Sequence, residues 1–279
     1  METRVSSATV EVIIGPERPT VIIGERINPA GRKELANSLK AGAMDMLRAE
    51  AATQAKAGAD ILEVNVSAFG IDEPELLPRA VKAVMETVDL PLCIDSPDPK
   101  ALAEALKVYK GKPLLNSVTG EESSLKKVLP LVREHGAAVI ALLQDDEGIP
   151  RDAEKRVSIA HKIARLAARE GIPRRDIVID CMAFAVGAYP ESGKVLLETI
   201  NRIRLELGMN MVLGTSNISY GLPHRGLLND SLVSMAISAG VTCHIANTSR
   251  IHPAVLASDL IMGRDPRARR YIGKFRQRK

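Results

Sequence analysis

Polar side chains recur at one end of the short apolar segments of this 279-residue chain. They are mostly Asn, Asp, Glu and Ser, groups that donate and accept hydrogen bonds without being strong nucleophiles on their own. Such a set suits a flat, amide-like heterocycle better than a phosphate group or a metal ion. In chain order these residues are Glu25 and Asn28, Glu63 and Asn65, Asp95 and Ser96, Asn116 and Ser117, Gln144 to Asp146, Asp180, Ser216 and Asn217, and His244 and Asn247.

Other kinds of site lack their sequence signatures. Only His244 among the histidines lies in a strand-like segment, which disfavours a His-rich metal site, and we predict no metal. The sequence contains no GxxxxGK[ST], GxGxxG or GxSxG motif, and no lysine ends a strand-like segment. Cys93, Cys181 and Cys243 are too far apart for a CxxC zinc site or a disulfide framework, so we expect a reducing cytoplasmic environment.

Each polar residue also has a purely structural interpretation. Asp95 and Asp180 could cap the helices that follow them, Asn116 and Asn217 could satisfy loop backbone groups, and Arg225 could be a solvated loop charge. The functional interpretation depends on the joint pattern, in which amide or carboxylate groups end four separate apolar segments.

Eight short apolar segments alternate with helical patterns along the chain. The alternation predicts one parallel sheet covered by helices, and eight units favour an α/β chain folded as a single-domain (β/α)8 TIM barrel over residues 1–279. In such barrels the C-terminal strand ends carry the chemistry. The expected strands are 20–25, 60–66, 91–96, 113–118, 137–143, 176–181, 210–217 and 241–247. The expected helices are 44–57, 76–88, 99–109, 124–135, 152–170, 192–207, 227–239 and 253–262.

Composition and charge exclude several classes of protein. Hydrophobic residues make up 46%, which is enough for a large core and rules out a disordered chain. The net charge of +4 comes from a basic extension at 264–279, where eight basic residues and one acid leave the rest of the chain at −3. The negative charge of the chain before residue 264 and the aromatic content of only 3% argue against nucleic-acid binding. No apolar run reaches the ~18 residues of a membrane span, and residues 1–12 do not form a signal peptide.

Several motifs occur in order along the chain. The segments are GERINPAG at 24–31, EVNV at 63–66, CIDS at 93–96, LNSV at 115–118, IDC at 179–181 and GTSNISYGLPHR at 214–225. From residue 21 to about residue 262, the chain resembles the pterin-binding methyltransferase family. It is most similar to the methyltetrahydrofolate:corrinoid protein methyltransferases, which include the folate module of cobalamin-dependent methionine synthase.

The resemblance implies roles for individual residues. Asp95, Asn116 and Asp180 match the residues that hold the pterin ring by hydrogen bonds. Asn217 matches the residue that contacts the pterin N5, and it is the expected catalytic residue. The remaining matched positions of the pterin site are Gly214, Ser216, Asn28 and Arg225, with Asn65 expected to lie behind the ligand-contacting residues.

The resemblance also implies an activity and partners. We expect methyl transfer between N5 of methyltetrahydrofolate and the cobalt of a corrinoid (cobalamin), in either direction. The corrinoid-binding DxHxxG pattern is absent, so the corrinoid is expected on a separate partner protein. Family members are usually homodimers, and the basic extension is expected to be solvated or to contribute to a dimer.

Three alternatives remain open at this point. A dihydropteroate synthase-like enzyme shares the pterin pocket but would carry an SRK-type segment, where this chain has TSNIS and IANTSR. A tetrahydromethanopterin-dependent methyltransferase would have similar pocket residues. A non-enzymatic pterin-binding or RNA-binding barrel is the third alternative.

Overall fold

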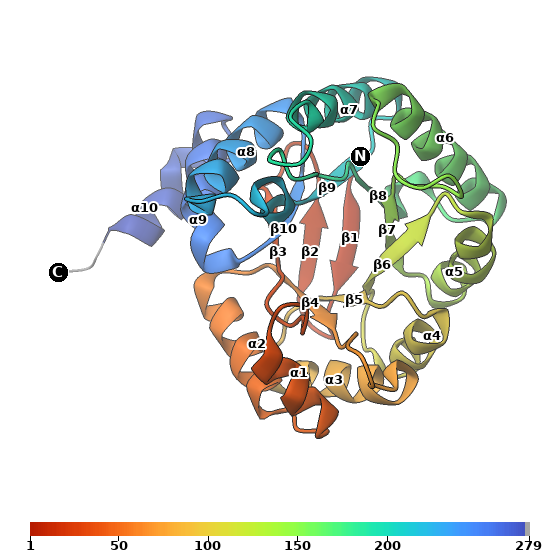
Figure 1. Cartoon of the computed structure of the whole chain (residues 1–279). Coiled ribbons are helices and arrows are strands. Elements are labelled where there is room, and N and C mark those ends of the chain that lie inside the picture. The colour runs from red at the N-terminus through yellow and green to blue at the C-terminus, as the bar shows by residue number, and fades with distance from the viewer. Residues whose placement is uncertain (277–279) are drawn as a thin grey trace.

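Eight parallel strands close into a barrel in the computed structural model, which describes residues 1–276 (Figure 1). The last strand pairs with the first, and each other strand pairs with its neighbours in the sequence. The predicted (β/α)8 barrel is therefore confirmed, and every predicted strand segment overlaps a barrel strand. The strands are β3 (Val21–Gly24), β4 (Ile61–Asn65), β5 (Leu92–Asp95), β6 (Leu114–Thr119), β7 (Ala138–Leu142), β8 (Ile177–Asp180), β9 (Asn210–Gly214) and β10 (Cys243–Ala246).

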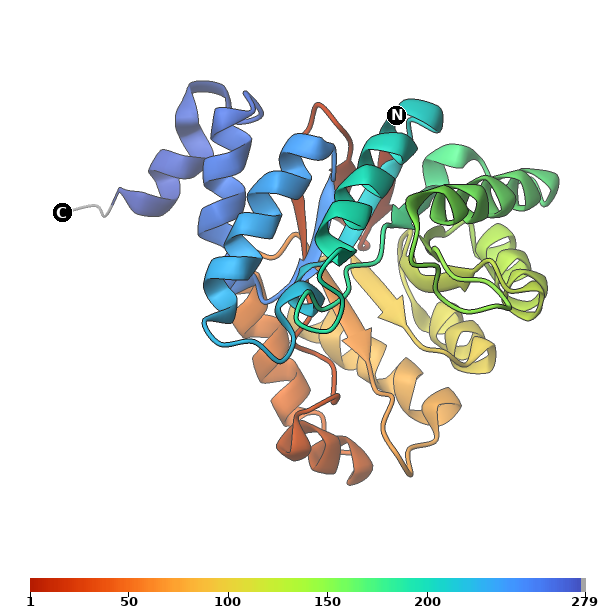
Figure 2. The ribbon, with the colours of Figure 1, turned by 45° about the horizontal axis from the view of Figure 1, so that its top comes forward.

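Helices surround the barrel on its outer face, as the ring of ribbons in Figure 1 and the tilted view in Figure 2 show. Buried Leu, Ile, Val and Ala side chains fill the layer between strands and helices. Gly58 and Gly136 adopt left-handed backbone conformations at the ends of α2 (Asp45–Ala57) and α5 (Glu122–His135), a conformation that favours glycine at the end of a helix. The helices are α1 (Lys33–Lys40), α2 (Asp45–Ala57), α3 (Glu73–Thr87), α4 (Pro99–Val108), α5 (Glu122–His135), α6 (Ala153–Arg169), α7 (Ser192–Glu206), α8 (Arg225–Ala239), α9 (Thr248–Ile261) and α10 (Arg269–Phe275).

A β-hairpin that the sequence patterns did not predict lies across the barrel in Figure 1. It consists of β1 (Thr3–Ser6) and β2 (Glu11–Ile14), which pair antiparallel. Val5 and Ile14 are fully buried and join the apolar side chains inside the barrel. The Asn210 amide, at the start of β9, donates hydrogen bonds to the Ile14 carbonyl at 3.0 Å and to Thr3 Oγ1 at 2.9 Å. The hairpin thus closes the N-terminal end of the barrel and leaves the C-terminal end open.

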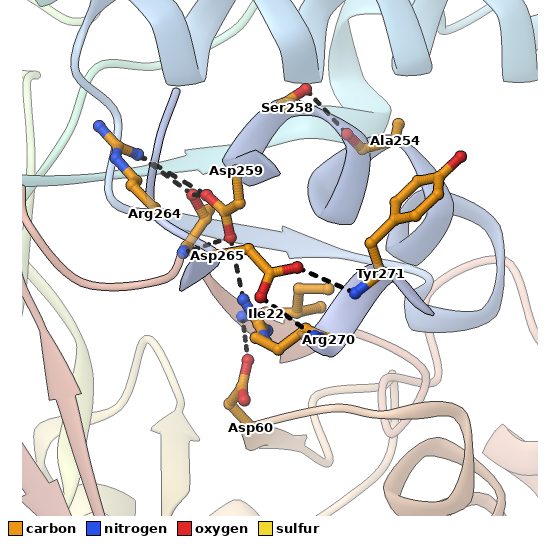
Figure 3. Close-up of polar contacts among 10 residues, drawn as sticks. Ile22, Asp60, Ala254, Ser258, Asp259, Arg264, Asp265, Arg270 and Tyr271 are labelled. Atoms are coloured by element: carbon orange, nitrogen blue, oxygen red, sulfur yellow. Dashed lines mark hydrogen bonds and ion pairs between the residues drawn. The ribbon is translucent and has the colours of Figure 1, made fainter. Parts of the chain in front are cut away.

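The described part of the basic extension is tied to the barrel through the buried carboxylate of Asp259 on α9 (Figure 3). Asp259 accepts hydrogen bonds from Thr20 N at 2.9 Å and Thr20 Oγ1 at 2.6 Å, and it forms an ion pair with Arg270 at 3.0 Å. Arg264 Nη1 donates to Thr20 Oγ1 at 3.3 Å, and Asp265 accepts from the backbone N–H of Arg270 at 3.0 Å. Arg264 and Arg270 therefore have structural partners, whereas 277–279 lie outside the described residues.

No helix within residues 1–276 is long and apolar enough to span a membrane.

Candidate active site at the barrel mouth

A cavity of about 840 Å³ opens at the C-terminal ends of the barrel strands, where barrels of this kind place their chemistry. Its lining includes residues at or just after the C-terminal ends of the barrel strands, most of which are polar. These include Glu25 and Asn28 after β3, Glu63 of β4, Asp95 of β5, Asn116 of β6, Gln144 after β7, Asp180 of β8, Gly214 of β9 and Asn217 after β9.

Strand register places two of the lining residues, Asp95 and Asn116, next to each other and next to Asn65, which is not part of the lining. Asp95 pairs with Asn65 on one side and with Asn116 on the other. Asn65 Nδ2 donates to Asp95 Oδ2 at 2.8 Å, so Asn65 lies beside Asp95 and orients it. Asn116 Nδ2 donates to Glu63 Oε1 at 3.2 Å. Because the Asn116 amide nitrogen is engaged, its Oδ1 is left as an acceptor for a ligand.

Asp180 completes the set of acceptors from the far side of the barrel. Its Oδ1 accepts a hydrogen bond from the backbone N–H of Met182 at 2.7 Å, a residue that also lines the cavity and has a positive φ of 58°. The second oxygen of Asp180 and Oδ1 of Asp95 have no hydrogen-bond partner within residues 1–276. The cavity therefore offers acceptors that a ligand carrying N–H donors would satisfy.

Burial changes the protonation of these carboxyl groups. It raises the pKa of Asp95 to about 6 and the pKa of Asp180 to about 6. The pKa of Glu63 lies well above its ordinary value, first because of burial and then because of the negative charges of Asp95 and Glu25. Burial also raises the pKa of Glu25. A ligand that donates hydrogen bonds to the ionised carboxylates would offset part of the free-energy cost of burying their charge.

The TSNIS turn that follows β9 carries Asn217 to the cavity as a short 3-10 helix, η2 (Thr215–Ser219). A Cβ atom on Gly214 would lie 3.1 Å from Asn217 Nδ2, so glycine leaves room for the Asn217 amide against the strand end. Thr215 Oγ1 and Nδ1 of the fully buried His244 lie 2.8 Å apart. Burial lowers the pKa of His244 to about 3, so this histidine is neutral and serves to fix the turn.

Ser216 and Arg225 hold the same turn from outside the cavity. Ser216 Oγ donates to Glu25 Oε1 at 3.0 Å. Arg225 donates to the Ser216 carbonyl at 2.6 Å and to Ser219 Oγ at 3.0 Å. Neither Ser216 nor Arg225 is among the residues that line the cavity. Through these contacts Ser216 and Arg225 hold the turn that carries Asn217.

Most of the residues predicted for the site come together in this cavity. Glu25 and Glu63 also line it, although the sequence analysis gave them no role in the site. The sequence did contain an indication of both residues, because they belong to the set of polar residues at the ends of the apolar segments. Within residues 1–276, no group of three or more His, Cys, Asp or Glu is arranged to hold a metal ion. The predicted residues that line the cavity are Asn28, Asp95, Asn116, Asp180, Gly214 and Asn217.

Known proteins are similar in sequence to this chain along most of its length. The chain is 32% identical over 269 residues to a methylcorrinoid:tetrahydrofolate methyltransferase of Eubacterium limosum, covering 93% of this chain and 97% of that protein. It is also 32% identical over 266 residues to a methionine synthase of Mycobacterium tuberculosis, covering 90% of this chain but only 22% of that longer enzyme.

Solved structures resemble the fold at lower sequence identity. A dihydropteroate synthase from Thermus thermophilus superimposes with a TM-score of 0.71 at 20% identity, covering 92% of this chain and 99% of that one. A dihydropteroate synthase from Xanthomonas albilineans superimposes with a TM-score of 0.72 at 19% identity, covering 94% of this chain and 99% of that one. These likenesses concern the fold alone. The model of the pterin binding enzyme family matches residues 24–247, a range that contains every predicted site residue, and the chain belongs to this family.

Proposed function

We propose that this enzyme transfers a methyl group between N5 of 5-methyltetrahydrofolate and the cobalt of a separate corrinoid protein, in either direction. The observation that carries the proposal is the convergence of Asp95, Asn116, Asp180 and Asn217 on one open cavity. The names of the two sequence relatives support it, since one is a methylcorrinoid:tetrahydrofolate methyltransferase and the other a methionine synthase.

In this proposal the free acceptors of the cavity bind the pterin ring. The ring has an amide N–H and an exocyclic amine. Asp95 and Asp180 each have an oxygen that lacks a partner among residues 1–276 and can accept from these groups. Asn116 adds its Oδ1, because Glu63 holds its amide nitrogen. Asn28 and Gly214 contribute to the wall of the site. Ser216 and Arg225 act through the turn that carries Asn217.

Methyl transfer makes a specific demand at N5. In the direction from folate to corrinoid, the N5–CH₃ bond breaks, cobalt(I) supplies the electron pair for the new Co–CH₃ bond and becomes cobalt(III), and N5 gains a proton. In the other direction N5 loses that proton. An amide is too weak an acid to supply the proton, but its hydrogen bond to N5 strengthens as charge develops. Asn217 would therefore stabilise the transition state more than the bound substrate.

The open C-terminal end of the barrel suits a partner that presents its corrinoid from outside. The hairpin of β1 and β2 closes the opposite end, so the cobalt has one route of approach, over the barrel mouth. We therefore place the corrinoid on a separate protein that docks transiently over the cavity.

An anaerobic assay tests the proposal. Purified protein is mixed with 5-methyltetrahydrofolate and free cob(I)alamin, and loss of the cob(I) absorption band is followed. We expect turnover that falls by about a hundredfold in Asn217→Ala, since removing one donor to developing charge costs on that order. Folate affinity, measured by calorimetry, should change far less. Asn201→Ala, on the exposed face of α7, is the matched control and should keep full activity.

Equal losses of rate and folate affinity in Asn217→Ala would refute the role of Asn217. Folate binding without turnover on free cob(I)alamin would mean that the partner protein is required. Absence of folate binding would refute the proposal as a whole. Repeating the titration with tetrahydromethanopterin separates the two possible pterin carriers.

A dihydropteroate synthase-like activity is the second candidate, and the observation that favours it is the shared barrel, with TM-scores of 0.71 and 0.72. It is tested by incubation with 4-aminobenzoate and the pyrophosphate ester of hydroxymethyldihydropterin. We expect no dihydropteroate to form. Formation of this product at a rate above that of methyl transfer would replace the first proposal.

We also propose that the enzyme acts in the cytoplasm as a homodimer. Cys93, Cys181 and Cys243 are buried free thiols, which is consistent with a reducing compartment. Light scattering coupled to gel filtration tests the dimer, and a mass of about one chain at micromolar concentration would refute it.

A further inference from the structure

A second cavity, of about 450 Å³, lies beside the barrel mouth. It is bounded by the segments that follow β7 and β8 and by the first turn of α7. Met182 and Ala183 line the active-site cavity, and the next residue, Phe184, lines this second one. The two cavities thus share a wall, but the residues that line them are different.

A buried guanidinium forms part of the lining of the second cavity. Arg156, on α6, is only 1% exposed. It donates hydrogen bonds to the carbonyl oxygens of Pro150 at 3.0 Å, Cys181 at 3.0 Å and Met182 at 3.1 Å. It forms no ion pair with any carboxylate within residues 1–276. Asp180 and Asp152 act on this cation electrostatically without forming a contact ion pair, and burial still lowers the pKa of Arg156. The three carbonyl groups and these carboxylates compensate part of the desolvation of the cation, so a carboxylate bound in the cavity would add a direct counter-charge.

The same cavity meets the positive end of a 15-residue helix. Ser192 and Val195, in the first turn of α7, belong to the lining, and the N-cap residue Glu191 makes no side-chain hydrogen bond to that turn. The Glu191 carboxylate also borders the cavity, but it is ion-paired with Lys194 at 3.0 Å. A helix N-terminus favours a bound anion, and here it acts on the same space as Arg156.

Aromatic rings supply the apolar part of the lining. Phe184 and Tyr189 pack edge to face with ring centroids 6.0 Å apart. The Arg151 guanidinium stacks 4.5 Å from the Tyr189 centroid, and the Arg156 guanidinium lies 5.1 Å from the Phe184 centroid. Two cations and two rings around one cavity match a ligand that carries both a negative charge and an aromatic ring.

We propose that this second cavity is a binding site for an aromatic carboxylate. The carboxylate would face Arg156, Arg151 and the N-terminus of α7, and the ring would pack against Phe184 and Tyr189. Binding of a free aromatic acid does not depend on the proposed methyl transfer, whereas binding of a folate arm rests on that proposed function. Its ligand could be a free aromatic acid or the aminobenzoyl-glutamate arm of a folate, since both present the same chemistry.

Fluorine NMR with 4-fluorobenzoate as the probe tests the site directly. We expect saturable binding to the wild-type protein that weakens as salt is raised. Arg156→Gln should weaken binding by about tenfold or more, because a charge-assisted hydrogen bond is lost. Since Arg156 also holds two backbone carbonyls of the shared wall, Arg151→Gln provides a second variant at an exposed position, and weaker binding is expected there as well. Arg165→Gln, an arginine on α6 away from the lining, is the matched control.

Two outcomes overturn the proposal. One is the absence of saturable binding to the wild-type protein at low salt. The other is an affinity for 4-fluorobenzoate in Arg151→Gln and Arg156→Gln equal to that in Arg165→Gln. Competition then identifies the source of the ligand. Displacement by 5-methyltetrahydrofolate but not by 6-methyltetrahydropterin, which lacks the arm, assigns the site to the folate arm. Persistence of the probe signal beside bound 5-methyltetrahydrofolate assigns it to a separate acid.

Discussion

Replacing Asp180 by Asn should make the protein more stable while it disables the active site. Asp180 ends β8 and lines the active-site cavity, and burial raises its pKa from the ordinary 3.8 to about 6. The folded protein therefore binds the Asp180 proton more tightly than the unfolded chain does. As the pH rises from about 4 through about 6, the folded state loses stability relative to the unfolded state, and the full penalty is present above pH 7.

The size of this penalty follows from the two pKa values. One pKa unit corresponds to about 1.4 kcal/mol, so a rise from 3.8 to about 6 corresponds to at most about 3 kcal/mol. Solvent in the open cavity screens part of this, and we expect a gain of about 1–2 kcal/mol for Asp180→Asn at pH 8. The asparagine retains an oxygen for the Met182 N–H, so the hydrogen bond at 2.7 Å has a replacement. At pH 5, where Asp180 is largely protonated, the gain should be roughly half as large.

Urea unfolding of wild type and Asp180→Asn at pH 8 and pH 5 measures the effect. Glu134→Gln, at an exposed position on α5, removes one negative charge elsewhere and should change stability by less than about 0.5 kcal/mol. In parallel, Asp180→Asn should lose folate binding, because the pterin ring loses a charged acceptor. A lower free energy of unfolding at pH 8, or a difference that is the same at both pH values, would refute the electrostatic reasoning.

Two further predictions concern the N-terminal end of the barrel. Arg270→Met should lower the free energy of unfolding by about 2 kcal/mol, since it leaves the buried Asp259 carboxylate with a weaker counter-charge, whereas exposed Arg269→Met should have little effect. Similar unfolding curves for the two variants would contradict this role of the extension. Deleting residues 1–15 should open the N-terminal end of the barrel and speed reaction of Cys243 with a thiol reagent, and an unchanged labelling rate in the folded protein would contradict the closure by the hairpin.

The barrel could be predicted from the sequence because each of its strands is apolar on both faces and is separated from the next by a helix. Such runs stand out even when a strand is only four residues long, as β3 and β5 are. The hairpin could not be predicted in the same way. Its strands are also four residues long, but they are not apolar throughout: Arg4 and Glu11 are exposed, and β2 buries only Ile14. Their position also depends on contacts with residues more than a hundred positions away. Helix α1 has the polar sequence KELANSLK and buries only Leu35 and Leu39, so its apolar signal is short.

The polar ring of the site was predictable for a geometric reason. In a closed parallel barrel all C-terminal strand ends meet at one mouth, so Asp95, Asn116 and Asp180 had to converge once the fold was known. The motif GTSNISYGLPHR did not reveal which of its residues face the cavity. Ser216 lies next to Asn217 in the sequence, yet its hydroxyl turns to Glu25 while Asn217 lines the cavity. The direction of each side chain depends on the 3-10 turn, which the strand and helix patterns do not encode.

Glu63 shows why a buried carboxyl group belongs in this site even though it destabilises the fold. Its pKa is raised by burial and by the neighbouring charges of Asp95 and Glu25, so its position is costly. It accepts a hydrogen bond from the Asn116 amide N–H at 3.2 Å, which leaves the Asn116 oxygen as the acceptor that this amide offers to the cavity. An apolar residue at position 63 would leave the Asn116 amide free to rotate and to present either a donor or an acceptor. In the proposed function, Asn116 offers an acceptor beside the acceptors of Asp95 and Asp180, and Glu63 is the residue that fixes the Asn116 amide in this orientation.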